Sequence, residues 1–286
     1  MPIGFLFGIL TAFLASFQNT QIRSLKTFSP YFLNALRFSA GVLVTALIVT
    51  FFSEWRLPSL WVSFLILCFV VPLEIATAYG YVRAFQYSPQ SLVGPLFSFS
   101  MVFLIPASYI LVGELPSPRG FLGVGSIFVG GFILSWDAYK PGIRNALFSI
   151  FRERGSYFML TAALTAGFSV AMIKFSLQYF PPVLFAFWTV FALMLLHLPA
   201  FFIHGFFTLR EKWKPAFLMA GAFGVGQALH YIGISLIVAV YFISLKRLSN
   251  VFDVLFGRIL GGEDHFLQRF IGALFMVAGA VFVAFG

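Results

Sequence analysis

The sequence is poor in cysteine and in charged residues. Cys68 is the single cysteine among 286 residues, which excludes a disulfide framework and a thiolate metal site. It stands in an apolar stretch, where a small buried side chain is expected. Only 9% of the residues are charged and 60% are hydrophobic, so a soluble globular domain is excluded as well. This composition predicts an all-α polytopic membrane protein.

Recognisable enzyme signatures are also missing. The chain contains no HExxH, CxxC or GxSxG sequence. We therefore expect no catalytic residues and neither a bound metal nor a cofactor. The net charge is +9, but the basic residues stand mostly in short connections between apolar runs. This pattern is typical of membrane topology signals and not of a nucleic-acid-binding surface, so we expect no nucleic-acid partner.

Apolar windows are what the sequence has in abundance. A spanning helix needs about 20 apolar residues, and ten windows of that kind follow one another along the chain. The connections are short, so function has to reside within the membrane. No charge precedes Arg23, which predicts a first spanning helix and not a cleaved signal peptide. The windows cover residues 3–21, 30–52, 59–82, 91–112, 119–136, 156–176, 182–206, 215–233, 236–260 and 267–285.

The ten windows have the signature of five windows taken twice. Gly113-Glu114 and Gly262-Glu263 each close one long window and precede another, 149 residues apart. A repeat with an odd number of helices necessarily inverts its second copy in the membrane. At the same offset, Phe121 matches Phe270, Gly123 matches Gly272 and Gly130 matches Gly279.

This repetition predicts the organisation of the chain. We expect ten transmembrane helices arranged as two inverted five-helix repeats. The first repeat covers residues 1–140, a connecting loop covers 141–155, and the second repeat covers 156–286.

The most unusual feature is the pair Lys246-Arg247 inside the ninth window. A charge at the bilayer centre costs roughly 2.5 kcal/mol or more, so such residues usually face a polar interior and mark a substrate or ion path. An arginine fork beside a movable lysine charge suits phosphate or carboxylate. On a continuous helix, Asn250 and Asp253 share a stripe with Lys246. We expect a substrate-binding site here; the alternative is a charge network that ties helices together.

Other polar residues within the windows are further candidates for this site. Gln227 and His230 stand one helical turn apart in the eighth window. They either orient a substrate together with Asn250 or form hydrogen bonds between helices. Asp253 is either a coupling residue or a structural partner of a neighbouring helix.

Glu74 is the candidate for proton coupling in the third window. It follows Pro72, which frees a carbonyl near Cys68 and bends the helix around the acid. An acid in a membrane cavity either carries protons or forms a salt bridge, and the partners at hand are Arg37 and Arg83.

Basic and acidic residues near the window ends have simpler interpretations. Arg23, Arg37 and Lys174 are expected to extend toward the membrane interface. Arg37 is also a candidate for the same coupling or charge network as Glu74 and Asp253. Glu114 and Glu263 stand where the following helices begin, and a carboxylate there favours the positive end of a helix dipole.

The paired halves resemble the EamA-type ten-helix members of the drug/metabolite transporter superfamily. Each half ends in Gly-Glu followed by a glycine-bearing last helix, and the segment SLVGPLFSFSMVFLIPASYILVGE (91–114) resembles the family's fourth helix. Lys246-Arg247 is also similar to the Lys-Arg pair that holds phosphate in plastid sugar-phosphate translocators. The repeat-equivalent positions are Phe97 and Ser98, so the resemblance implies a cavity with one cationic pole.

The resemblance and the residues together predict a secondary transporter working by alternating access. The predicted cargo is a small polar, anionic metabolite, phosphorylated or carboxylate, moved with protons or by exchange. The alternatives are an exporter of amino acids or other zwitterions and a non-transporting membrane receptor or scaffold. We expect a multi-pass protein of the cell's inner or plasma membrane, a monomer or homodimer, in contact with the lipid bilayer and its substrate. Basic residues favour external termini, whereas the family implies cytoplasmic ones, so orientation stays open.

Overall fold

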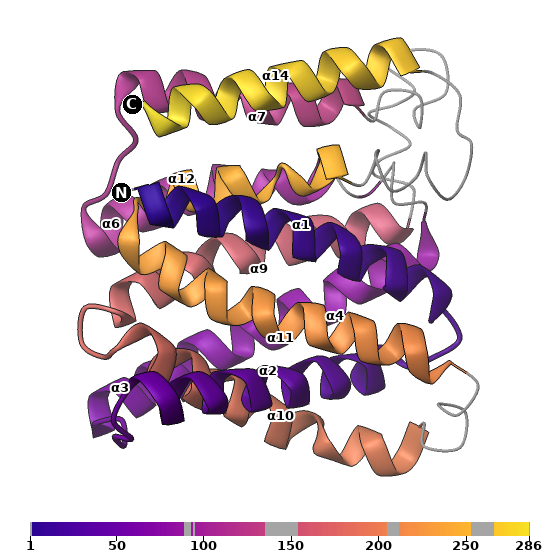
Figure 1. Cartoon of the computed structure of the whole chain (residues 1–286), viewed down its shortest axis with the longest axis vertical. Coiled ribbons are helices and arrows are strands. Elements are labelled where there is room, and N and C mark those ends of the chain that lie inside the picture. Colours follow the sequence, from indigo (N-terminus) through magenta and orange to yellow (C-terminus); the bar gives the residue numbers. More distant parts are fainter. Residues whose placement is uncertain are drawn as a thin grey trace.

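The computed structural model describes residues 2–88, 93, 95–134, 154–204, 212–252 and 266–285, and these residues are helical apart from their connections. The long helices lie roughly side by side, and both chain termini lie at the same end of the bundle (Figure 1). We call this end the terminal end. An even number of crossings brings the two termini to one side, as ten spanning segments require.

In the part of the chain that the structure describes, helices lie in each of the ten predicted windows. α3, η1 and α4 follow one another without a gap and form the third span, and η2 with α6 forms the fourth. Six of the described spans are long and apolar enough to cross a membrane by length and composition alone. The elements are α1 (Pro2–Ser24), α2 (Pro30–Phe52), α3 (Leu60–Leu65), the π-helix η1 (Ile66–Val70), α4 (Val71–Tyr87), the 3₁₀ helix η2 (Pro95–Phe99), α6 (Ser100–Val112), α7 (Pro118–Leu134), α9 (Arg154–Ser176), α10 (Pro182–His204), α11 (Trp213–Leu236), α12 (Ala239–Lys246) and α14 (Phe266–Ala284).

The second half of the chain inverts the first. α1 begins at the terminal end, whereas its counterpart α9 begins at the opposite end (Figure 1). The contacts between helices follow the same repeat. α1 packs on α11, and their counterparts α9 and α4 also pack on each other. Likewise, α12 packs on α1, and their counterparts α6 and α9 pack on each other. The remaining counterparts pack on each other, α2 on α10 and α7 on α14. The prediction of two inverted five-helix repeats is therefore confirmed.

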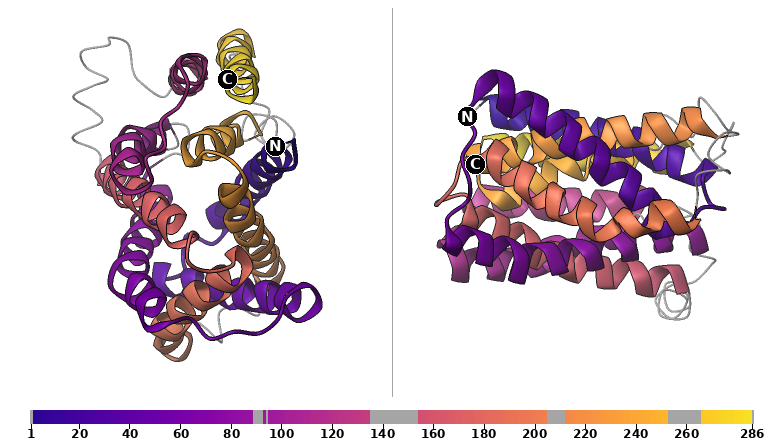
Figure 2. Two further views of the ribbon diagram at one scale, coloured as in Figure 1. Left: turned by 90° about the vertical axis from the view of Figure 1, so that its left-hand side faces the viewer. Right: turned by 90° about the horizontal axis from the view of Figure 1, so that it is seen from below.

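α7 and α14 form a pair at one edge of the bundle (Figure 2). Glycines allow them to approach closely. A methyl group on Gly123 would lie 2.7 Å from the carbonyl oxygen of Gly279, and one on Gly130 would lie 2.7 Å from that of Gly272. The two contacts are repeat equivalents of each other, because Gly272 lies 149 residues after Gly123 and Gly279 lies 149 residues after Gly130. This crossing is thus an antiparallel contact between repeat-equivalent helices.

The third span is irregular just before its proline. Pro72 has no N–H to donate to the carbonyl one turn back, and the N–H of Val71 bonds to Ile66, five residues back. The predicted disturbance near Pro72 is therefore a π-helical turn, which shifts the register of the helix ahead of Glu74. Cys68 lies within this turn and is exposed, so the expectation that it is buried was wrong.

The glycine contacts generate a stability prediction. Gly123→Ala should lower the melting temperature of the purified protein, because its methyl group would overlap the α14 backbone. Gly125→Ala on the same helix is the matched control, since a methyl group there meets no atom within 4 Å. Alanine favours a helix by about 1 kcal/mol over glycine, so the control should keep or raise the melting temperature. Equal effects of the two substitutions would contradict the close α7–α14 contact.

Candidate functional site

A central cavity lies where the two halves meet. Its walls come from α1, α2, α4, η2, α6, α9, α11 and α12, and its volume is about 140 Å³. Pockets for drug-sized ligands are larger, about 300–1,000 Å³, so this space suits a smaller molecule. Six of the eight predicted site residues line it: Arg37, Glu74, Gln227, His230, Lys246 and Arg247.

The backbone forms a tight turn at the pair Lys246-Arg247. α12 ends at Lys246, and the N–H groups of Arg247, Leu248 and Asn250 each bond to a carbonyl three residues back, at 3.0 Å. Bonds of this kind are typical of 3₁₀ turns, which are wound more tightly than an α-helix. The ninth span is therefore not the continuous α-helix assumed from the sequence.

This turn moves Asn250 out of the predicted site. With three residues per turn, positions four apart no longer share a face, and Asn250 does not line the cavity. A methyl group on Gly131 would lie 3.5 Å from the Asn250 amide nitrogen and 3.9 Å from the Ser98 hydroxyl. The prediction that Asn250 shares the cavity face with Lys246 was thus wrong. Asp253, predicted on the same stripe, lies outside the described residues.

Arg247 is held by uncharged partners from the first half. Its Nη2 donates to Ser100 Oγ at 2.6 Å, and its guanidinium stacks over the Phe97 ring at 4.2 Å. Its Nε has no hydrogen-bond partner. Phe97 is the repeat equivalent of Lys246. The uncharged counterpart of the basic pair therefore supplies an aromatic face to that pair.

Arg37 is held in a similar way on α2. Its Nη1 donates to Asn34 Oδ1 at 2.8 Å, and its guanidinium stacks over Phe223 at 4.4 Å. With only 7% of its surface exposed, Arg37 does not extend toward the membrane interface as predicted. Both cavity arginines are thus positioned without neutralisation of their charge.

Lys246 and Glu74 lie in the same cavity but do not form an ion pair. Lys246 makes no hydrogen bond or ion pair with any residue that the structure describes. Glu74 instead accepts a hydrogen bond from Ser169 Oγ at 2.5 Å. The predicted alternative, a salt bridge from Glu74 to Arg37 or Arg83, is not formed. The described lining therefore contains three cations and one carboxylate that are not paired with one another.

His230 and Gln227 complete the polar part of the wall on α11. The His230 ring is 5% exposed and packs on the edge of Phe242, with ring centres 5.4 Å apart. Its Nδ1 has no hydrogen-bond partner. The alternative role predicted for Gln227 and His230 was hydrogen bonding between helices. His230 Nδ1 forms no such bond.

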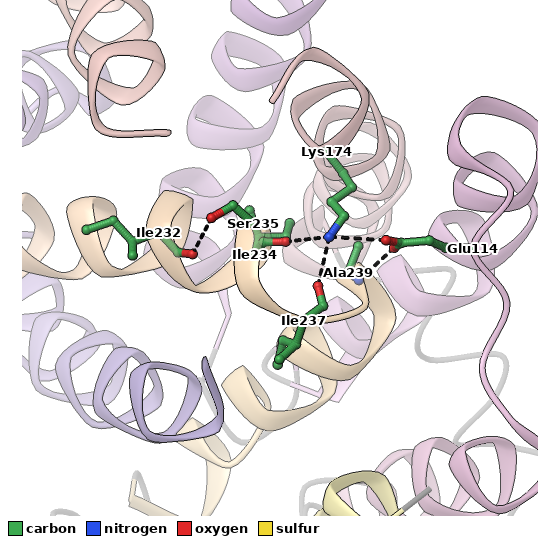
Figure 3. A network of polar contacts seen from close by, with 7 residues as sticks. All are labelled: Glu114, Lys174, Ile232, Ile234, Ser235, Ile237 and Ala239. Carbon is green, nitrogen blue, oxygen red and sulfur yellow. Dashed lines mark hydrogen bonds and ion pairs between the residues drawn. The ribbon is translucent and has the colours of Figure 1, made fainter. Parts of the chain in front are cut away.

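Two charged residues at the terminal end bind each other, contrary to prediction. Lys174 Nζ lies 3.1 Å from Glu114 Oε1 (Figure 3), so Lys174 does not extend to the interface. Glu114 Oε2 accepts from the N–H of Ala239 at 3.1 Å, so this carboxylate caps α12 and not α7. The side chain of Arg23 and residue Glu263 lie outside the described part.

Two serines that contact the charged cavity residues could not be identified from the sequence. Ser169 and Ser100 are 0% and 2% exposed. A serine in an apolar helix is usually a small packing residue, so neither position stands out from its neighbours. Only the folded chain brings these hydroxyls to Glu74 and Arg247.

Comparisons with known proteins agree with this architecture. The family model described as "EamA-like transporter family" matches residues 2–136 and 153–285. A solved structure titled only "Crystal structure of protein" covers 98% of this chain and 98% of its own, with a TM-score of 0.77 and 17% sequence identity. At that identity the likeness shows the fold alone. No curated protein sequence matches the chain.

The different surroundings of the two basic neighbours predict different effects on stability. Lys246→Met should leave the melting temperature unchanged or raise it, because Lys246 has no partner to lose and a half-buried charge is removed. Arg247→Met should lower stability by about 1–3 kcal/mol, because the contacts with Ser100 and Phe97 are lost. Thermal unfolding of both variants in detergent measures this. An equal loss in the two variants would indicate that Lys246 belongs to a structural network.

Proposed function

Because the chain belongs to the EamA-like transporter family, we propose that it is a secondary transporter of a small anionic metabolite, phosphorylated or carboxylate. The substrate passes through the central cavity by alternating access. One observation carries the choice of an anion: Lys246 faces the cavity without a partner among the described residues.

Physical chemistry makes an anion the fitting ligand for this cavity. A desolvated cation without a partner is costly, and an anionic group that enters the cavity offsets this cost. Arg37 and Arg247 are fixed by an amide, a hydroxyl and two aromatic rings, which orient the guanidinium groups but leave their charge available. Fixed arginines lose little conformational entropy on binding, and the lysine adds a movable charge.

The backbone around the site supports transport and not static binding. Substrate sites of secondary transporters commonly lie at interrupted helices between inverted repeats. Here α12 stops at Lys246 and is followed by a tight turn. The exchange of helix contacts between the halves also supports two related packings, one open to each side of the membrane.

Glu74 is the proposed carrier of a coupled proton. It is the carboxylate of the described cavity lining, and its partner Ser169 is a neutral hydroxyl. Protonation of Glu74 would therefore break no ion pair with a cavity cation. Exchange of one anion for another is the other mode of operation and needs no such proton. We place the protein in the cell's inner or plasma membrane, as a monomer or homodimer.

A zwitterion such as an amino acid is the second candidate substrate. The specific observation in its favour is that Glu74 lines the same cavity as the cations. In this alternative, Lys246 and Arg247 bind the carboxylate and Glu74 binds the ammonium group. A receptor or scaffold is less favoured, because Lys246 has no structural partner among the described residues.

Ligand binding to the purified protein tests the substrate class. We expect glycerol 3-phosphate or succinate to raise the melting temperature, because a ligand that binds only the folded state stabilises it by about 2.7 kcal/mol at 100 times its Kd. The shift should vanish in Lys246→Met. Alanine and choline represent the zwitterionic and cationic classes. A shift with alanine alone would favour the second candidate, and no shift with any anion would contradict the proposal.

Transport into proteoliposomes tests the role of Glu74. If protons are coupled, a pH gradient should drive accumulation of the anion that binds, and Glu74→Gln should abolish this dependence while exchange continues. Thr165→Val is the matched control, because its hydroxyl joins α4 to α9 through Thr77 but carries no charge. Accumulation that follows the gradient in Glu74→Gln would exclude Glu74 as the proton carrier. If anion accumulation by the unsubstituted protein does not depend on the pH gradient, exchange is the favoured mode of transport.

A further inference from the structure

The ion pair between Glu114 and Lys174 joins four segments at the terminal end. Glu114 follows α6, and Lys174 lies in the last turn of α9. Lys174 Nζ also donates to the carbonyls of Ile234 and Ile237, at 2.8 and 2.9 Å, where α11 ends (Figure 3). Glu114 binds the N–H of Ala239, where α12 begins. We call this group of contacts the latch.

The latch occupies the charged ends of two helices. The last carbonyls of a helix and its first N–H groups lack partners within that helix, and they carry partial negative and positive charge. Lys174 meets the carbonyls at the end of α11, and Glu114 meets the N–H at the start of α12. Because the two side chains also bind each other, the contacts are mutually supporting.

The latch lies directly beyond the cavity on three helices. On α9, Lys174 is one turn past the lining residue Val170. On α11, Ile234 is one turn past His230, and on α12, Ala239 is one turn before Ile243. Three walls of the cavity are therefore joined at the same level. The latch therefore lies between the cavity and the terminal end on these three helices.

A second contact strengthens the same closure. The hydroxyl of Tyr241 on α12 accepts from the N–H of Ser117 at 2.8 Å. Ser117 belongs to the connection between α6 and α7 that also carries Glu114. The connection is thus attached to the start of α12 at two points.

We propose that the Glu114–Lys174 pair holds the cavity closed at the terminal end in one state of the transport cycle and separates when that end opens. This inference rests on the proposed transport function. Neither residue lines the cavity, so both act by setting the position of helices and not by touching the substrate. Partial burial of both side chains, 12% and 22% exposed, makes their attraction stronger than that of a surface pair.

Accessibility of a cysteine in the cavity tests the latch without any substrate. Val170→Cys is the reporter, in a Cys68→Ser background that removes the native thiol. A membrane-impermeant maleimide is applied to proteoliposomes from each side. Protease cleavage of a short N-terminal tag identifies the side that carries the termini. We expect slow labelling of the parent from that side.

Loss of the ion pair should open the terminal end. Glu114→Gln keeps an oxygen for the Ala239 N–H but removes the charge, and Lys174→Met removes the other partner. Each should raise the labelling rate from the terminal side about tenfold, without raising it from the opposite side. Ser235→Ala is the matched control, because the Ser235 hydroxyl bonds within α11 to Ile232 and joins no other helix.

The outcomes separate the latch from the transport function. Rates unchanged in both latch variants, or raised equally from both sides, would overturn the latch. If the anions neither bind nor cross while the latch variants label faster from the terminal side, the proposed substrate fails and the latch stands. If transport persists and labelling does not change, the latch alone is wrong.

Discussion

The absence of an acidic partner for Lys246 among the described residues is the constraint on which this account depends. A bilayer-spanning protein keeps an internal cation only where something compensates for its lost hydration. Two of the three cavity cations, Arg37 and Arg247, receive aromatic faces and neutral hydrogen-bond acceptors. Lys246 receives neither, and the carboxylate in the same cavity binds Ser169 instead. The arrangement leaves positive charge for a ligand to neutralise, which is why a small anion fits the site.

The inverted repeat explains how such a cavity is built and how it opens. α7 and α14 pack on each other through glycine backbones at the edge of the bundle, and none of their described residues lines the cavity. Ser126 on α7 donates to the carbonyl of Phe275, its repeat equivalent on α14, at 2.7 Å. The wall comes from α1, α2, α4, η2, α6, α9, α11 and α12, and the latch joins α9, α11 and α12 at the terminal end.

Most of the fold could be predicted from the sequence, because apolar windows and an odd-numbered repeat follow from hydrophobicity and spacing alone. The basic pair and Glu74 also stood out, since charges are rare in spanning helices. The partners of these residues could not be predicted. Asn250 was placed on the cavity face because a regular helix was assumed, and a single tight turn moved it. Glu114 was assigned to the helix that follows it in sequence, whereas folding brings its carboxylate to α12. The partner of such a side chain depends on which helix ends meet in the fold, and this cannot be read from the neighbouring sequence.

Counterflow transport into proteoliposomes tests the central claim most directly. Vesicles loaded with an unlabelled anion, glycerol 3-phosphate or succinate, are diluted into the same labelled anion, and uptake by the parent protein is compared with uptake by Lys246→Met. The account predicts transient accumulation of the labelled anion in the parent and its loss in a variant that remains folded. Accumulation that persists in Lys246→Met, or a parent that moves neither anion, would contradict the claim that Lys246 binds the transported substrate.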